Sequence, residues 1–567
     1  MLGIDVIDWV VLTLYMAGIA SIGIFTYKKV KNTSDYFIGN RKFGKLLMTA
    51  QAFGSGTHTD QPVSVAGATY QIGLAGIWYQ WIWMFATPFY WLLAPIYRRL
   101  RYITVGDFFE QRYGKSVGAL YGMFGLVFFM VNIGTMLKGT GTTIAAITNG
   151  ALSIEMSVLS MGVLIILYGL AGGLVAAAIT DFIQGMFIIV LSFLLIPFAF
   201  NVIGGFRELH MSLPDNMFSF VAPVEVTLFF IIMAVINGLI GIVVQPHHMA
   251  VTSAGKSEHD CRVGYTYGNF IKRITTVGWA YVGILAAVLY PNLEHRELAF
   301  GVAVTNLLPV GLIGLMLASM MAATMSTCDT FMVSASALFT RNFYRVYFMQ
   351  LSSRTNLLLI ARVVSAIVII GGVVFAFYIP NVIFGMKVIW KITAFLGISF
   401  WFGIVWRNAN RYGAWASFLV ASIISVVVGD TFSWGLGWDF KYESALYLPS
   451  GFLAMILVSK LTKPEPAEQL NKFYALLDTP VGEEDRLKKQ GIEMILEGNK
   501  IPANKEYIRT GISQTDKGHS LLIVNLFKLY KNFSYKKYRV DIIGFMLSWI
   551  IVFLIIAVTI WFAGIGS

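Results

Sequence analysis

Apolar segments that are long enough to cross a membrane recur along nearly the whole chain. A transmembrane helix needs about 20 consecutive, mostly apolar residues, and a sliding window of about this length finds fourteen such spans. They lie near residues 5–27, 44–73, 75–97, 116–148, 152–171, 174–201, 223–246, 263–290, 309–339, 356–379, 383–406, 411–429, 443–460 and 539–565. The sequence therefore predicts an all-α polytopic membrane protein with about fourteen transmembrane helices.

Composition and charge limit the class of protein further. Hydrophobic residues make up 57% of the chain and charged residues only 13%, whereas soluble globular domains carry about a quarter charged residues. The net charge is +12, but lysine and arginine gather at the ends of apolar spans, which is the distribution that fixes membrane orientation. We therefore expect no nucleic-acid partner. The two cysteines, Cys261 and Cys328, offer neither a disulfide framework nor metal-ligand spacing.

The basic loops predict which side of the membrane each segment faces. Six lysine and arginine residues follow the first span and five follow the third, whereas the loops near 202–222 and 291–301 each hold one arginine. Loops rich in these residues face the cytoplasm, where we expect contacts with anionic lipids. An even number of spans then places both termini outside, in the plasma membrane or, in a bacterium, the inner membrane.

One long polar segment, 461–537, separates the last two spans. Within its stretch EEDRLKKQGIEMILEGNK, Leu487, Ile492, Ile495 and Leu496 have approximately helical spacing. The segment carries no nucleotide-binding, kinase or DNA-binding motif. We predict a cytoplasmic loop that forms a surface helix or a linker between the last two spans.

The ninth span carries a row of oxygen ligands. Ser326, Asp329 and Thr330 are separated by three and four residues, so they share one helix face, and Thr327 lies beside them. A carboxylate inside a membrane span is costly and indicates function, and hard oxygen ligands suit a small cation such as sodium. The alternative for the hydroxyls is a bond to the preceding carbonyl group.

Two spans contain residues that interrupt helices. The second span has Gly54-Ser55-Gly56 and Pro62 at membrane depth, and the seventh has Asn237-Gly238, Gly241 and then Gln245-Pro246. Interrupted helices at matching positions of two repeats point to a binding site at the membrane midplane. We expect a cytoplasmic loop, not a metal site, at His247 and His248, and interface anchors at Lys272, Lys387 and Lys391.

Five motifs, taken together, resemble the sodium:solute symporter family. They are SDYFIGNRKFG at 34–44, TVGDFFEQRYG at 104–114, ITDFIQG at 179–185, QPHHMAVTSAGKS at 245–257, and MSTCDT at 325–330 with FTRNFYR at 339–345. The resemblance implies a leucine-transporter-type core of five plus five helices in an inverted repeat, spans two to eleven here, which works by alternating access. It also implies a transporter and not an enzyme, without an organic cofactor, and we expect it to function as a monomer.

The spans and this resemblance together divide the chain into six parts. We expect an extra N-terminal helix with the first cytoplasmic loop at 1–43, a first five-helix repeat at 44–201, a second at 202–410, two peripheral helices at 411–460, the cytoplasmic loop at 461–537 and a C-terminal transmembrane helix at 538–567.

The resemblance also implies where sodium binds. The family's shared site uses the break of the first core helix and the eighth core helix, and the matching residues here are Gly54, Thr57, Ala323, Ser326 and Thr327. A second sodium site, present in some members, matches Asp181, Asp329 and Thr330. Three roles stay open for Asp329: it binds a second cation, carries a proton, or tunes the first site.

Solute residues follow from the same resemblance. Gln61, Gln80 and Asn237 match sugar-contacting residues, and amides suit polyols because each offers donors and an acceptor. His58 and Asp60 suit a sugar acid or another solute with a carboxylate, together with four lysines, Lys138, Lys272, Lys387 and Lys391. For the last three lysines this role is the alternative to an interface anchor.

We therefore predict a sodium-coupled symporter that imports a small polar solute, a sugar or a sugar acid. The alternatives are a sodium symporter for an amino acid, carboxylate or choline-like solute and, from a different class, a transporter-like membrane sensor.

Overall fold

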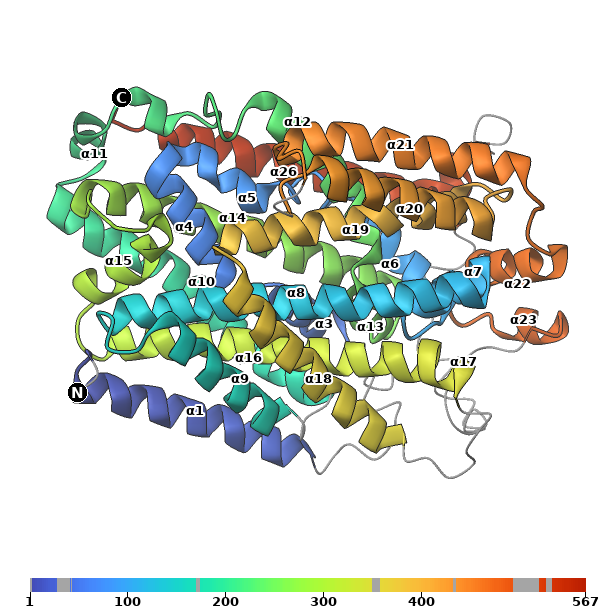
Figure 1. The fold of residues 1–567 in the computed structure, drawn as a ribbon, viewed down its shortest axis with the longest axis horizontal. Coiled ribbons are helices and arrows are strands. Elements are labelled where there is room, and N and C mark those ends of the chain that lie inside the picture. The colour runs from blue at the N-terminus through green and yellow to red at the C-terminus, as the bar shows by residue number, and fades with distance from the viewer. Residues whose placement is uncertain are drawn as a thin grey trace.

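The computed structural model describes residues 3–27, 41, 43–169, 174–348, 357–431, 435–492, 520–526 and 533–566. These residues form long helices that run along one axis of an elongated bundle (Figure 1). Both ends of the chain lie at one end of this bundle, and the short helices α22 (Ala467–Asp478) and α23 (Asp485–Lys489) lie at the other (Figure 1). In the described part of the chain, β-structure is limited to two isolated bridges, Phe43 with Gly255 and Gly429 with Trp438.

A helix, or a group of short helices, stands at each of the fourteen predicted spans. The elements are α1 (Val6–Tyr27), α3 (Lys45–Gly54), α4 (Asp60–Ile72), η2 (Gly73–Ile77), α5 (Trp78–Trp81), α6 (Phe89–Leu100), α8 (Lys115–Ile147), α9 (Ile154–Gly169), α10 (Leu174–Ile203), α12 (Leu228–Gly241), η4 (Ile242–Val244), α13 (Pro246–Ser253), α14 (Glu258–Leu289), α16 (Leu312–Phe339), α18 (Leu357–Tyr378), α19 (Val382–Val405), α20 (Arg411–Val428), α21 (Phe440–Leu461) and α26 (Tyr535–Ala563). Among the described residues, nine helices are long and apolar enough to cross a membrane singly.

Three predicted spans are not single helices. The second is divided into α3 and α4, and the seventh into α12 and α13, which are bent by 56°. The third consists of η2, α5 and α6, with turns from 82 to 88 before α6 begins at Phe89. Pro88 lacks the N–H that a continuous helix would need at this point. The first two interruptions were predicted, whereas the third was not.

The helices α8 and α16 form the centre of the bundle. The helix α16 packs against α1, α8, α10 and α18, and nearly all its side chains are buried. Glycine allows the closest approach: a Cβ atom at Gly139 of α8 would lie 2.6 Å from the Cα of Asp60, so α8 touches the start of α4 directly. The break between α3 and α4 is therefore enclosed by the two central helices.

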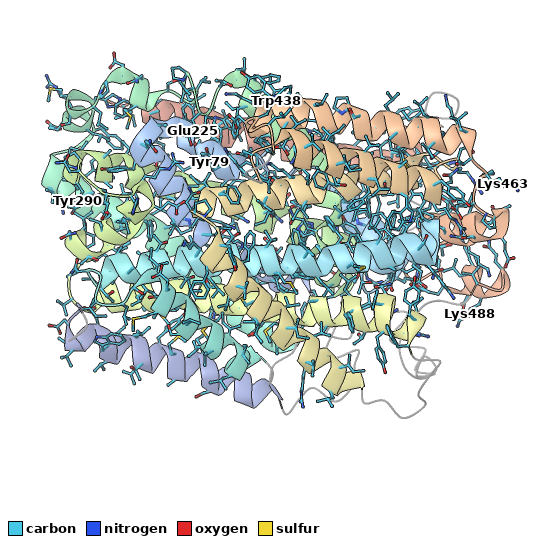
Figure 2. All side chains as sticks on the ribbon, in the orientation of Figure 1. Tyr79, Glu225, Tyr290, Trp438, Lys463 and Lys488 are labelled. Atoms are coloured by element: carbon cyan, nitrogen blue, oxygen red, sulfur yellow. The ribbon has the colours of Figure 1, made fainter. Side chains whose placement is uncertain are left out.

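The segment 461–537 differs from its prediction. Its first described helix, α22, was not predicted, and it packs on α6 and on α7 (Val105–Tyr113). Of the predicted surface helix, the described residues hold α23, after which Gly491 adopts a positive φ of 68°. Residues 493–519, which include Ile495 and Leu496, lie outside the described part. Lys463 and Lys488 mark this end of the bundle in Figure 2. An ion pair between Arg101 and Glu484, 2.8 Å long, fastens the segment to the end of α6.

Candidate ion and solute site

The first broken helix supplies free backbone groups near the centre of the bundle. The helix α3 ends at Gly54, residues 55–59 are not helical, and α4 begins at Asp60. Single turns bridge the gap: the N–H of Gly56 donates to Phe53 O at 3.3 Å and that of Thr57 to Gly54 O at 3.2 Å. A helix interrupted in this way leaves carbonyl oxygens available for a cation.

Oxygen atoms of α16 meet these carbonyls. The hydroxyl of Thr327 lies 3.5 Å from Gly54 O and 3.1 Å from Ala323 O, and the hydroxyl of Ser326 lies 3.3 Å from Ala323 O. Thr57 donates its hydroxyl to Phe53 O at 2.7 Å and lines a small cavity that it shares with Ala323. All five residues expected at the shared sodium site thus lie around one point, and their oxygen-only donor set fits sodium.

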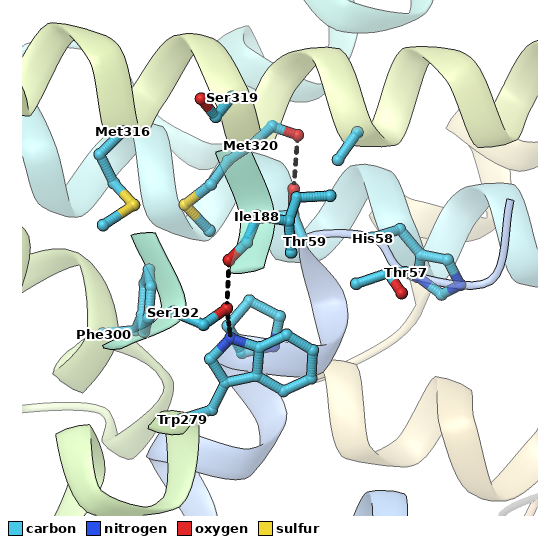
Figure 3. A pocket seen from close by; sticks show the side chains of 12 residues that line it. Thr57, His58, Thr59, Ile188, Ser192, Trp279, Phe300, Met316, Ser319 and Met320 are labelled. Atoms are coloured by element: carbon cyan, nitrogen blue, oxygen red, sulfur yellow. Dashed lines mark hydrogen bonds between the residues drawn. The ribbon is translucent and has the colours of Figure 1, made fainter. Parts of the chain in front are cut away.

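A second hydroxyl cluster holds the break against both central helices. Thr59, the last residue before α4, donates to Met320 O at 2.8 Å (Figure 3). Its hydroxyl also lies 2.9 Å from the hydroxyl of Thr324. The hydroxyl of Thr140 on α8 also lies 2.9 Å from Thr324. These bonds tie α4, α8 and α16 together at the level of the candidate ion site.

The residues expected at a second ion site are only partly described. Asp329 and Thr330 are buried on α16, and the Thr330 hydroxyl has no hydrogen-bond partner among the described residues. The backbone of Asp181 belongs to α10, but its side chain lies outside the described residues. Gln184, one turn further along α10, is buried and its Oε1 also lacks a described partner.

Three of the expected solute residues gather at the carbonyl of Gly56. Gln61 donates to this oxygen at 2.8 Å and approaches the His58 ring at 3.3 Å, and His58 is paired with Asp60. The ammonium of Lys272, on α14, donates to the same carbonyl. Lys272 is only 9% exposed, so the expectation of an interface anchor is wrong. It stands 14 residues into α14, about 21 Å from the helix start at 1.5 Å per residue, and this depth favours the alternative role, at a solute carboxylate.

The other expected solute residues lie elsewhere. Gln80 is buried on α5. Asn237 donates to Trp390 O at 2.9 Å and accepts from the Tyr447 hydroxyl at 2.5 Å, so both ends of its amide are bonded within the protein. Lys138 lines a separate cavity of about 550 Å³, to which none of the other expected site residues contributes.

Tyrosine hydroxyls donate to the free carbonyl groups at the second helix break. The carbonyl of Val243 accepts from Tyr97 at 2.7 Å, and that of Val244 accepts from Tyr121 at 2.6 Å. His247 and His248 then begin α13 and are buried, so the expected cytoplasmic loop is wrong at these positions. The ring of His247 packs against Phe128 and Phe331, which explains its burial.

Lys391 is a second lysine whose role differs from the expected interface anchor. It is 3% exposed and forms ion pairs with Glu443 at 2.6 Å and Asp430 at 2.9 Å. These acids come from α21 and from the end of α20, so the pairs fasten the peripheral helices to α19. Lys387, by contrast, is partly exposed and lies 3.6 Å from Asp439.

Comparison with known proteins supports the assignment made from motifs. Residues 36–421 match the sodium:solute symporter family. An osmoregulated proline transporter of Bacillus subtilis is 24% identical over 82% of this chain and 97% of its own length, and a sodium/glucose cotransporter of Vibrio parahaemolyticus is 24% identical over 73% and 83%. Among solved structures, a sodium-coupled sialic acid symporter in a substrate-bound, outward-open state superimposes with a TM-score of 0.68 at 18% identity, covering 81% of this chain and 98% of that one.

A nucleobase-cation symporter superimposes with a TM-score of 0.51 and covers 79% of this chain. These similarities confirm the expected leucine-transporter-type core of five plus five helices. Because the family match covers more than half of the chain, the assignment does not rest on a single motif. The chain belongs to the sodium:solute symporter family, whose members are membrane transporters and not enzymes.

Proposed function

We propose that this protein imports a small polar solute that carries a carboxylate, driven by sodium bound at the first helix break. The observation that supports sodium is the meeting of the Gly54 and Ala323 carbonyls with the Ser326 and Thr327 hydroxyls. The shared site holds one ion in this proposal, and Asp329 with Thr330 supports a second ion or a proton.

Lys272 supports a carboxylate on the solute. Its ammonium is buried, donates to Gly56 O and forms no ion pair with any carboxylate of the described residues. Asp60 interacts with this ammonium electrostatically but is itself paired with His58. A buried charge without a close counter-ion costs several kcal/mol, and a solute carboxylate would supply one. Sugar acids and amino acids both carry one. The similarity to a proline transporter and to a glucose cotransporter favours neither class over the other.

Thermal stability of the purified protein tests this proposal, because a ligand of the folded state raises the melting temperature. We expect D-glucuronate or L-proline to raise it in sodium chloride but not in potassium chloride, and D-glucose and choline to have no effect. Lys272→Met should abolish the shift. The matched control is Lys387→Met, which removes a lysine outside the site and should leave the shift intact. A shift with glucose or choline and with neither carboxylate would overturn the proposal.

The same proposal assigns the sides of the membrane. The end of the bundle with α22 and α23 faces the cytoplasm, and both termini face outside, in a plasma membrane or a bacterial inner membrane. The basic residues around α6, α7 and α22 support this orientation. Tags at the two termini should react with a membrane-impermeant reagent in intact cells; labelling only after permeabilisation would reverse the orientation.

A further inference from the structure

A second cavity, of about 550 Å³, lies apart from the helix break. It lies between the end of α4, the middle of α8, the start of α9, the loop 291–298 and the start of α19. Tyr70, on its wall, donates to the carbonyl of Tyr290 at 2.9 Å, and Tyr290 marks the end of the bundle at which both termini lie (Figures 1 and 2). Its volume is within the range of about 300–1,000 Å³ that is usual for small-molecule sites.

Most charged groups around this cavity are engaged by the protein. Arg296 donates to Glu225 at 3.1 and 3.2 Å and to Gln71 at 2.6 Å. The carboxylate of Glu297 accepts from the N–H groups of Val382 and Ile383 at the start of α19, at distances from 2.9 to 3.2 Å. These side chains hold the walls of the cavity in place.

Lys138 differs from them. Its side chain lines the cavity from α8 and is half-buried, and its ammonium forms no ion pair or hydrogen bond with the described residues. Glu155 and Glu297 are near enough to interact with it electrostatically but not to pair with it. The ammonium of Lys138 is thus available to hydrogen-bond a ligand in the cavity, because no described residue bonds to it.

Lys138 lies next to the contact that separates the cavity from the candidate solute site. Its neighbour Gly139 packs directly on Asp60, with a Cβ position 2.6 Å from the Cα of Asp60. Asp60 belongs to the group that surrounds the carbonyl of Gly56 on the other side of this contact. Lys138 therefore lines the cavity one residue away from the contact between Gly139 and Asp60, and the helix break lies on the other side of that contact.

We infer that this cavity is the outer access path of the transporter and that Lys138 is a specificity-determining residue in it. Its ammonium binds the carboxylate of the incoming solute before the solute passes to Lys272. This inference rests on the proposed function and adds a first binding step to it. Glu294 and Glu297 offset the charges of Arg296 and Lys138 in the cavity, so selection comes from the position of Lys138 rather than from an overall positive charge.

The rates of binding provide the first test. A residue that acts only on the access path changes association and dissociation equally and leaves the equilibrium constant unchanged. In sodium, we expect Lys138→Gln to slow both rates for D-glucuronate or L-proline by about tenfold, the lower range for electrostatic steering, and Lys138→Arg to restore them. The probe that responds distinguishes a sugar acid from an amino acid. Unchanged rates, or a changed equilibrium constant, would overturn the inference.

Chemical labelling provides a second test that needs no transported solute. Ile154 also lines the cavity and is half-buried, and both native cysteines are buried. We expect Ile154→Cys to react faster with a sulfonate-bearing methanethiosulfonate than with its trimethylammonium analogue. Lys138→Gln should remove this preference and Lys138→Arg should keep it. If Ile154→Cys shows the same ratio of the two labelling rates alone, with Lys138→Gln and with Lys138→Arg, the inference is wrong. If the preference for the sulfonate reagent is present but no solute carboxylate binds to the protein, only the proposed function is wrong.

Discussion

The two broken helices of the core look alike in sequence but differ in what satisfies their free carbonyl groups. At the first break, Gly54 O faces a hydroxyl of α16 at 3.5 Å, and Gly56 O is shared by Gln61 and Lys272. At the second break, Val243 O and Val244 O are each bonded to a buried tyrosine at 2.6–2.7 Å.

This difference shows that an interrupted helix does not by itself indicate a ligand site. A carbonyl that a tyrosine already satisfies contributes to stability, because an unpaired buried acceptor costs about 1–3 kcal/mol. A carbonyl whose partners are side-chain hydroxyls, an amide and an ammonium that forms no ion pair with the described residues can exchange those partners for a ligand. We therefore propose binding at the first break and a structural bend at the second.

The largest expected effect is at the first break. Replacing both hydroxyls, Ser326→Ala with Thr327→Ala, removes two oxygen ligands from a desolvated cation, so we expect sodium affinity to fall more than about a hundredfold, equivalent to about 3 kcal/mol. The rise in melting temperature with sodium concentration measures this affinity.

The control for this variant is on the same helix. Ser336 donates to the Val333 carbonyl at 2.9 Å and takes no part in the proposed site, so Ser336→Ala should retain the wild-type sodium dependence. If the double variant keeps its sodium affinity while folding normally, the assignment of the ion to this break is wrong.

A smaller effect, on stability and not on sodium affinity, is expected at the second break. Tyr121→Phe leaves Val244 O unpaired in a buried position, which should lower the free energy of unfolding by about 1–3 kcal/mol. The melting temperature should fall by a few degrees while the sodium affinity stays unchanged. A loss of sodium affinity without a loss of stability would mean that the second break also belongs to the ion site.

The smallest effect concerns Asp329. If this carboxylate binds a second sodium, Asp329→Asn should lower the Hill coefficient for sodium and leave coupling to one ion. If it carries a proton, the Hill coefficient should stay and the pH dependence of uptake should disappear. A variant that matches wild type in both measurements removes Asp329 from the mechanism.

Local patterns in the sequence were sufficient to predict the spans and the first break. Long apolar runs can only be satisfied as helices in lipid, and Gly54-Ser55-Gly56 interrupts one of them wherever its neighbours lie. Partners distant in the chain could not be predicted in this way. Asn237 is bonded to Tyr447 of a peripheral helix, 210 residues away. Lys391 is buried, and its ion-pair partner Glu443 lies on α21.

Uptake into proteoliposomes tests the central claim most directly. With a sodium gradient directed inward, labelled D-glucuronate or L-proline should accumulate above its external concentration, and a potassium gradient should produce no accumulation. The Ser326→Ala, Thr327→Ala variant should lose this accumulation, and Ser336→Ala should keep it. Equal uptake in the two gradients, or full accumulation by the double variant, would contradict a symporter driven by sodium at the first helix break.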